Sequence, residues 1–114
     1  MSTASDSGRP AAPVATAPII FEAIVRRQAV AATYNGVPVT LAPHVIYTRH
    51  DDLFIDAITL DRDGKPPKET KVGTFKLAGL NALRLTPRGF PKHPLFQAND
   101  PKYEGVALMT VEAA

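Results

Sequence analysis

The fold is decided by a run of eight residues near the middle of the chain, Leu53-Phe54-Ile55-Asp56-Ala57-Ile58-Thr59-Leu60. It is the longest stretch typical of a buried β-strand, because β-branched and aromatic residues recur in it and glycine and proline are absent. The segments on both sides have the composition of strands that can pair with it. The sequence therefore predicts a mainly β domain organised around residues 53–60.

A hairpin and a bent strand are expected before this central strand. Residues 29–34 form a short strand, and Asn35-Gly36 is a strong hairpin signal because both residues tolerate positive φ. The next strand begins at Val37. Pro43 interrupts it and strand-favouring residues resume at 45–48, so we expect one long strand with a bend at Pro43.

Two further strands are expected after the polar loop 61–70, at residues 71–78 and 81–86. If residues 79–81 connect them as a hairpin, one register places all the large apolar residues on the core face. In that register the facing pairs are Phe75 with Leu85 and Leu77 with Leu83. We therefore expect a small SH3/Sm-like β-barrel of about five antiparallel strands with one N-terminal α-helix.

The two ends of the chain differ from this centre. Residues 1–17 are poor in large apolar side chains and are expected to be a disordered tail, and Pro18 is expected to open a helix. The barrel domain should then cover residues 18–97. The proline-rich segment 87–102 should be extended and held to the barrel by Phe90, Leu95 and Phe96. A C-terminal extension, 98–114, can add one further strand at 106–111.

Composition excludes several classes of function. The chain has 114 residues, no cysteine and a formal net charge of +2, so it fits a single domain without disulfides. Its three histidines are isolated, there is no nucleophile elbow, and its glycines are scattered. We expect neither an enzyme, nor a metal site, nor a cofactor. Without a signal peptide or a long apolar run, a cytoplasmic protein outside the membrane is expected.

The best candidate site is a pair of basic residues. In the expected register Lys76 lies opposite Arg84, and two convergent cations can bind a phosphate or a nucleic-acid backbone. Arg88 and Lys92 could extend this anion-binding surface. The alternatives are that both cations are simply solvated, or that Asp56 neutralises them. Tyr47 and Phe90 could stack on bases, or could instead be core residues.

The order of segments resembles the WYL domain of bacterial transcription regulators. A helix carrying Ala23-Ile24-Val25-Arg26-Arg27 is similar to the family's first motif, residues 53–55 would take the place of Trp-Tyr-Leu, and residues 73–80 would match the later arginine-containing motif. The resemblance covers roughly residues 19–97. It implies an Sm-like barrel and a ligand-sensing role with nucleotides or nucleic acid as ligands.

This chain departs from the family at its polar positions. Leu53 and Phe54 stand where the family has tryptophan and tyrosine, Gly73 and Gly79 stand for two motif arginines, and only Lys76 keeps a motif cation. With a tail alone before the helix, a stand-alone domain is expected. The first hypothesis is a non-catalytic regulatory domain that binds an anionic ligand, either a nucleotide or single-stranded nucleic acid. The alternative is a protein-interaction module that binds no nucleic acid.

Overall fold

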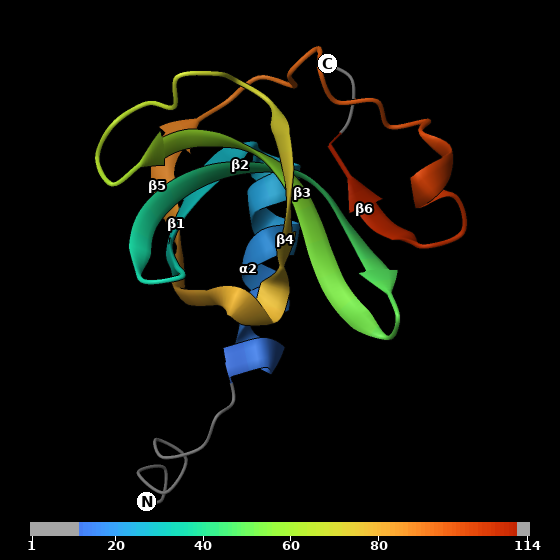
Figure 1. Ribbon diagram of the computed structural model, residues 1–114. Helices are drawn as coiled ribbons and strands as arrows, with labels where there is room; N and C mark the ends of the chain where they lie inside the picture. Colours follow the sequence, from blue (N-terminus) through green and yellow to red (C-terminus); the bar gives the residue numbers. More distant parts are fainter. Residues whose placement is uncertain (1–11, 112–114) are drawn as a thin grey trace, which may run out of the picture.

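A computed structural model describes residues 12–111 and shows a mainly β protein with one α-helix (Figure 1). The prediction of a mainly β chain is thereby confirmed. Six antiparallel strands form one sheet, and two short 3-10 helices interrupt the connections. The elements are α2 (Ala12–Arg26), β1 (Gln28–Tyr34), β2 (Val37–Arg49), β3 (Asp52–Arg62), β4 (Val72–Lys76), η1 (Leu77–Gly79), β5 (Leu80–Gly89), η2 (Pro101–Tyr103) and β6 (Ala107–Thr110).

The sheet is strongly curved and open (Figure 1). Its strand order is β4-β3-β2-β1-β5, so among residues 12–111 the edges β4 and β5 are not paired with each other. The sixth strand, β6, pairs with β2 and lies off this path. The helix α2 packs against β1, β2, β5 and η1 and closes the core on that side. The expected central strand is confirmed, because β3 pairs with β2 on one side and β4 on the other.

The long strand β2 bends where the sequence places Pro43. Its first half pairs with β1 and its second half with β6, while β3 pairs along nearly its whole length. The register with β3 shifts between Pro43 and Val45, which makes His44 the extra residue of a bulge. The bulge also changes which side chains point inward: Val39 and Leu41 are buried core residues before it, and Ile46 after it.

The expected Asn35-Gly36 hairpin is confirmed. Both residues have positive φ, 52° and 77° respectively, as a tight two-residue turn requires. The polar turn after β2 uses the same conformation, since φ is 52° at His50 and 68° at Asp51. Histidine and aspartate tolerate this region better than most side chains.

The expected hairpin between the fourth and fifth strands is wrong. β4 pairs with β3 and β5 pairs with β1, at opposite edges of the sheet. Residues 77–79 form the 3-10 helix η1, which carries the chain from one edge to the other with Leu77 and Leu80 buried. An alternating pattern predicts which face a side chain takes but not which strand it pairs with, so the pattern fits both arrangements.

The helix begins at Ala12, six residues before the expected start at Pro18. Pro18 lies inside α2, where it removes one backbone hydrogen bond but does not end the helix. Residues 12–17 of the expected disordered tail are therefore helical, and residues 1–11 lie outside the described part of the chain. Within residues 12–111, no helix has both the length and the apolar character that a membrane crossing needs.

The segment after β5 returns across the sheet before β6, and the expected final strand is confirmed. Two of its three expected anchors are correct, since Phe90 and Phe96 are buried, but Leu95 is 51% exposed. A further aromatic residue, Tyr103, is buried with them.

Replacing Ile55 by alanine should lower the free energy of unfolding by about 2–5 kcal/mol, because Ile55 is fully buried in the central strand and the change leaves a cavity. Urea unfolding followed by circular dichroism measures the loss. Leu108→Ala is the control. Leu108 is 51% exposed, so this change should lower the free energy of unfolding by less than about 1 kcal/mol, as is usual for surface substitutions. Equal losses for the two variants would contradict the assigned core.

Candidate anion-binding face

One face of strands β2, β3 and β4 combines polar and aromatic side chains. Across the three strands, Tyr47 lies beside Phe54 and Phe54 beside Lys76. The next row of the same face places Asp56 beside Thr74. We call this the outer face, because the intervening row, Ile46-Ile55-Phe75, points into the core.

Asp56 is the centre of the outer face. Asp56 is buried, yet four donors reach its two side-chain oxygens. Oδ1 accepts hydrogen bonds from the Tyr47 hydroxyl at 2.7 Å and the Thr74 hydroxyl at 2.8 Å. Oδ2 accepts from the Lys102 ammonium at 2.9 Å and from the Tyr103 hydroxyl. Sheet residues therefore hold one oxygen, and residues of η2 hold the other.

These contacts keep the buried carboxylate ionised. Burial alone would raise the pKa of Asp56, but the hydrogen bonds from Tyr103, Tyr47, Lys102 and Thr74 together outweigh it and hold that pKa below its usual value. Burial, with the hydrogen bond to Asp56, raises the pKa of Tyr47 to about 12. The same causes raise the pKa of Tyr103 well above its usual value. Both phenols therefore stay protonated donors at neutral pH.

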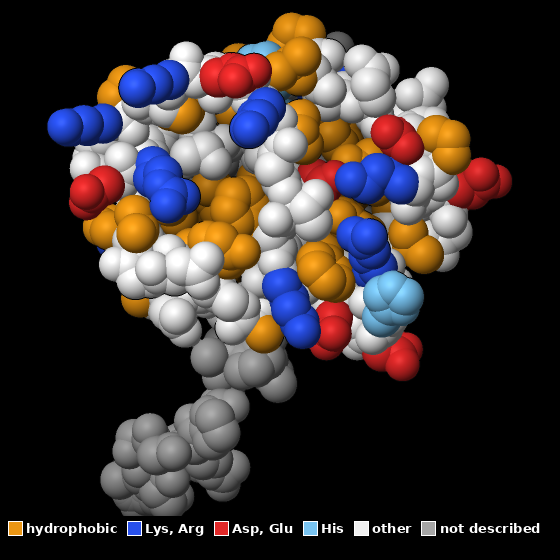
Figure 2. Space-filling model, in the orientation of Figure 1, with side chains coloured by type: hydrophobic (Ala, Val, Ile, Leu, Met, Phe, Trp, Pro, Cys, Tyr) orange, Lys and Arg blue, Asp and Glu red, His pale blue; other side chains and the backbone are white. Residues whose placement is uncertain are grey.

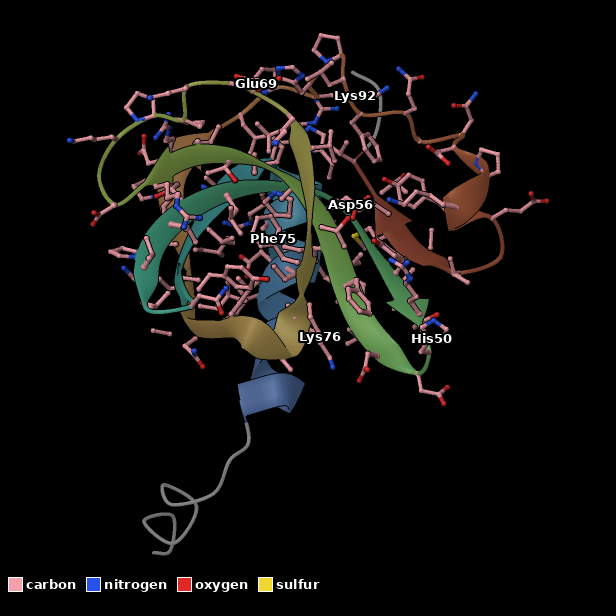
Figure 3. All side chains as sticks on the ribbon, in the orientation of Figure 1. His50, Asp56, Glu69, Phe75, Lys76 and Lys92 are labelled. Carbon is pink, nitrogen blue, oxygen red and sulfur yellow. The ribbon has the colours of Figure 1, made fainter. Side chains whose placement is uncertain are left out.

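A cation and an aromatic ring lie together beside this cluster. The rings of Tyr47 and Phe54 are stacked, with centroids 6.1 Å apart, and the Arg49 guanidinium lies 5.8 Å from the centre of the Phe54 ring. Phe54 is only half-buried. Figure 2 shows basic side chains around an apolar patch on this side of the molecule, and Figure 3 shows Lys76 and His50 on either side of the lower part of β3.

A hollow adjoins Arg49 at the end of β2. Its volume is about 570 Å³, and its lining consists of Tyr47, Thr48, Arg49, His50, Lys102 and Val106. This volume is within the range of small-molecule sites, roughly 300–1,000 Å³. The wall combines a guanidinium, an ammonium and an imidazole with a tyrosine edge, which suits a ligand that carries negative charge.

The four basic residues that the sequence analysis selected do not gather at one place. Lys76 is on β4 and forms an ion pair with Asp52 at 3.3 Å, whereas Arg84 is on β5 at the opposite edge and donates to the Ala82 carbonyl at 2.8 Å. The expected Lys76–Arg84 pair is therefore wrong, because it depended on a β4–β5 hairpin.

The other two selected residues follow Arg84 along the chain. Arg88, near the end of β5, pairs with Asp61 at 2.9 Å. Lys92 is half-buried in the segment after β5. Their predicted role as anion contacts stays a prediction, and so does that of Arg84.

Of the two alternatives for Tyr47 and Phe90, stacking surface or core residue, burial favours the core. Tyr47 and Phe90 are 2% and 7% exposed and serve as core and anchor residues, whereas Phe54 is more accessible. Asp56 was considered only as a neutralising group for Lys76 and Arg84, and it pairs instead with Lys102. An acidic residue in the most apolar strand was the signal for a buried polar cluster, because such a group must find donors.

Gly73 and Gly79 both lie against aromatic rings. A Cβ atom at Gly79 would lie 3.3 Å from the Tyr34 ring, and one at Gly73 would lie 3.3 Å from the Phe75 ring. Larger side chains here would have to displace aromatic rings.

His44, the bulge residue of β2, forms a second polar contact with the returning segment. Its Nδ1 donates to the Ala42 carbonyl at 2.8 Å, which leaves Nε2 to accept from the His93 amide at 3.0 Å. Its ring lies between Phe90 and Phe96, with centroids 5.2 Å from each. Burial lowers the pKa of His44, only partly opposed by the Ala42 hydrogen bond, and nearby His93, Lys92 and Arg27 lower it further.

No group of three or more histidine and acidic side chains placed to hold a metal ion occurs within residues 12–111. Comparison of the chain with protein-family models, with curated proteins and with solved structures finds no match. The geometry of the outer face is therefore the main guide to function.

Tyr103→Phe should lower the free energy of unfolding by about 1.5–3 kcal/mol, since it removes one hydrogen bond to a buried carboxylate and keeps the ring. Urea unfolding at pH 7 measures the change. The matched control is Tyr34→Phe, because within residues 12–111 the Tyr34 hydroxyl has no hydrogen bond. A Tyr103→Phe loss no larger than the control would show that the contact contributes nothing to stability.

The stability of the protein should fall as the pH is lowered from about 7.5 to about 5.5. The pKa of His44 is below 6.5 in the folded state, so the unfolded chain binds the proton more readily, and His44 contributes stability above pH 6.5 that is lost as the pH falls through the folded pKa. Urea unfolding at several pH values should show a shallower decline for His44→Gln than for the wild type. His50→Gln, at an exposed turn, should keep the wild-type decline.

Proposed function

We propose that this protein is a non-enzymatic binding domain whose outer face takes an anionic ligand with a planar ring, a nucleotide or a nucleotide unit of single-stranded nucleic acid. The observation that carries the proposal is the half-exposed Phe54 ring with the Arg49 guanidinium 5.8 Å from its centre. A base can stack on an aromatic face, and an adjacent guanidinium can bind phosphate through two hydrogen bonds.

The charge around Phe54 favours a small anion over a long polyanion. Among residues 12–111, no carboxylate lies within ion-pair distance of Arg49, so its charge is available. Lys76, the cross-strand neighbour of Phe54, already pairs with Asp52 in an exposed ion pair, which a ligand phosphate can replace at little cost. We therefore expect about two phosphate contacts and a modest salt dependence.

The finer architecture that we infer is an SH3/Sm-like barrel, as the resemblance to WYL domains implies. The edge strands β4 and β5 follow each other in the chain and are joined by η1, which brings the two edges together at that end. The Tyr34 ring of β1 meets the Phe75 ring of β4 edge to face, with centroids 5.1 Å apart. This contact between two strands that do not pair supports a sheet curved nearly into a barrel. A regulatory, nucleotide-sensing role stays part of the proposal.

A second candidate function is a protein-interaction module. It is favoured by the two sheet edges, β4 and β5, that no other described strand covers, because an extended peptide can add to such an edge. It predicts a partner recovered by pull-down, little salt dependence, and binding that does not change when Arg49 or Phe54 is replaced.

Fluorescence anisotropy with a labelled AMP and with a labelled single-stranded oligonucleotide tests the first candidate. Phe54→Leu keeps the apolar bulk and removes the ring face, so it should weaken binding about 5- to 150-fold, which is the usual contribution of one stacked base. Arg49→Ala should weaken it similarly. The matched control is Arg62→Ala, an exposed arginine at the end of β3, which should bind like the wild type.

Salt distinguishes the ligand classes. Oligonucleotide affinity should fall roughly 5- to 20-fold between about 50 and 200 mM salt if two or three phosphates are contacted. Lys76→Ala should reduce this salt dependence. Arg84→Ala should reduce it only if the bound oligonucleotide extends across to β5. Absence of binding by both probes to the wild-type protein would rule out the nucleotide proposal and favour the interaction module.

A further inference from the structure

Residues 90–106, which we call the strap, leave the end of β5 and cross the outer face before β6 begins. Three aromatic anchors hold the strap to the sheet: Phe90, Phe96 and Tyr103. Val106 at the end of the strap also packs against the core, and polar contacts complete the set. The His93 amide donates to Nε2 of His44, and the side chains of Lys102 and Tyr103 donate to Asp56. One backbone bond runs the other way, since the Thr48 amide donates to the Val106 carbonyl at 3.1 Å. The side-chain acceptors of the contact, His44 and Asp56, lie on the sheet and receive donors from the strap.

A segment in which few side chains are buried can open more easily than the core of the sheet. When the strap leaves, water can replace each donor on His44 and Asp56, so most of the hydrogen-bond energy is recovered. Most strap side chains are exposed, including Leu95 at 51%. Segments with few buried apolar contacts are the ones that open locally before the whole molecule unfolds. We therefore expect the strap to open as a unit.

One strap residue also reaches the proposed ligand site. The Lys102 ammonium lies 2.9 Å from Oδ2 of Asp56 and 5.9 Å from the centre of the Tyr47 ring. It lines the hollow that contains Arg49, and it also lines a smaller hollow of about 160 Å³ beside Asp56 and Thr74. The Lys102 side chain is 44% exposed. Its ammonium has three N–H donors, and those not bonded to Asp56 are available to a ligand in these hollows.

We propose that Lys102 is a further contact for the anionic ligand, so that the site is complete only while the strap is docked and ligand binding holds the strap closed. This rests on the proposed function, because it adds a strap residue to the site on the sheet. Asp56 is then a positioning residue. It holds Lys102 at the hollow that Arg49 also lines, and it retains its three other donors if the ammonium shifts toward a phosphate.

The consequence is a measurable coupling. A ligand that contacts both the sheet and the strap binds the docked state more tightly than the open state, and by reciprocity it reduces the open population. If the open state does not bind the ligand, that population falls by a factor of about 1 + [ligand]/Kd. A ligand held by the sheet alone would leave strap opening unchanged.

Hydrogen exchange of the full chain, followed by mass spectrometry with and without AMP, tests the coupling. At about 100 times Kd, peptides that cover residues 93–106 should exchange about 100-fold more slowly where they exchange through strap opening. Lys102→Met should weaken AMP binding and reduce this protection, and Lys102→Arg should restore both because it keeps the cation. Lys68→Met, the same charge change in the exposed loop before β4, should leave both unchanged.

The outcomes separate this inference from the proposed function. If AMP and the oligonucleotide both fail to bind the wild-type protein, the proposed function fails and the coupling fails with it. If AMP binds and Phe54→Leu weakens the binding, but strap exchange does not respond to AMP, the coupling alone is overturned. AMP affinity that is unchanged in Lys102→Met would likewise exclude Lys102 as a contact.

Discussion

The structure depends on one buried carboxylate. Asp56 lies buried in the central strand β3, and an isolated charge there would cost several kcal/mol. Four donors from β2, β4 and η2 offset that cost. Two of them come from residues nearly fifty positions further along the chain, so the final third of the chain has one preferred place on the sheet. A hydrophobic residue at this position would pack, but it would not select Lys102 and Tyr103 among the alternatives.

The second constraint is the division of β2 between two neighbours. Because β1 pairs with its first half and β6 with its second half, the strand must bend between them, and the bulge at His44 provides the bend. The extra residue is used as well, since His44 accepts the His93 amide and packs between two phenylalanine rings. His44 thus provides both the bend that curves the sheet and the first polar contact of the strap.

Local features of the fold could be predicted from the sequence because their causes are local. The turn at Asn35-Gly36, the bend at Pro43, the central strand 53–60 and a final strand near 106–111 each follow from neighbouring residues. Strand pairing does not, since Phe75 and Leu77 face the core whether β4 pairs with β3 or with β5. The wrong pairing predicted that Lys76 and Arg84 face each other, whereas the sheet places them at opposite edges.

The candidate site was predicted less well for a related reason. Arg49 and Phe54 lie on either side of the tight turn that joins β2 and β3, but Lys102 is far along the chain, and only the return of the strap brings it close. Of the basic residues that we assign to the site, only Lys76 was predicted from the sequence. The presence of Asp56 in an apolar strand indicated a polar cluster, but the identity of its donors depends on long-range contacts that no local pattern records.

The bulge at His44 also determines how the chain can tolerate changes of length. Inward-facing positions are odd-numbered before it and even-numbered after it, so β2 contains one residue more than a regular strand between the same ends. Substitutions leave the number of residues in β2 unchanged. A single inserted residue between Val45 and Tyr47 would exchange the faces of the residues that follow, turning Tyr47 toward the core and away from Asp56. Related chains should therefore vary in composition along β2 far more readily than in length.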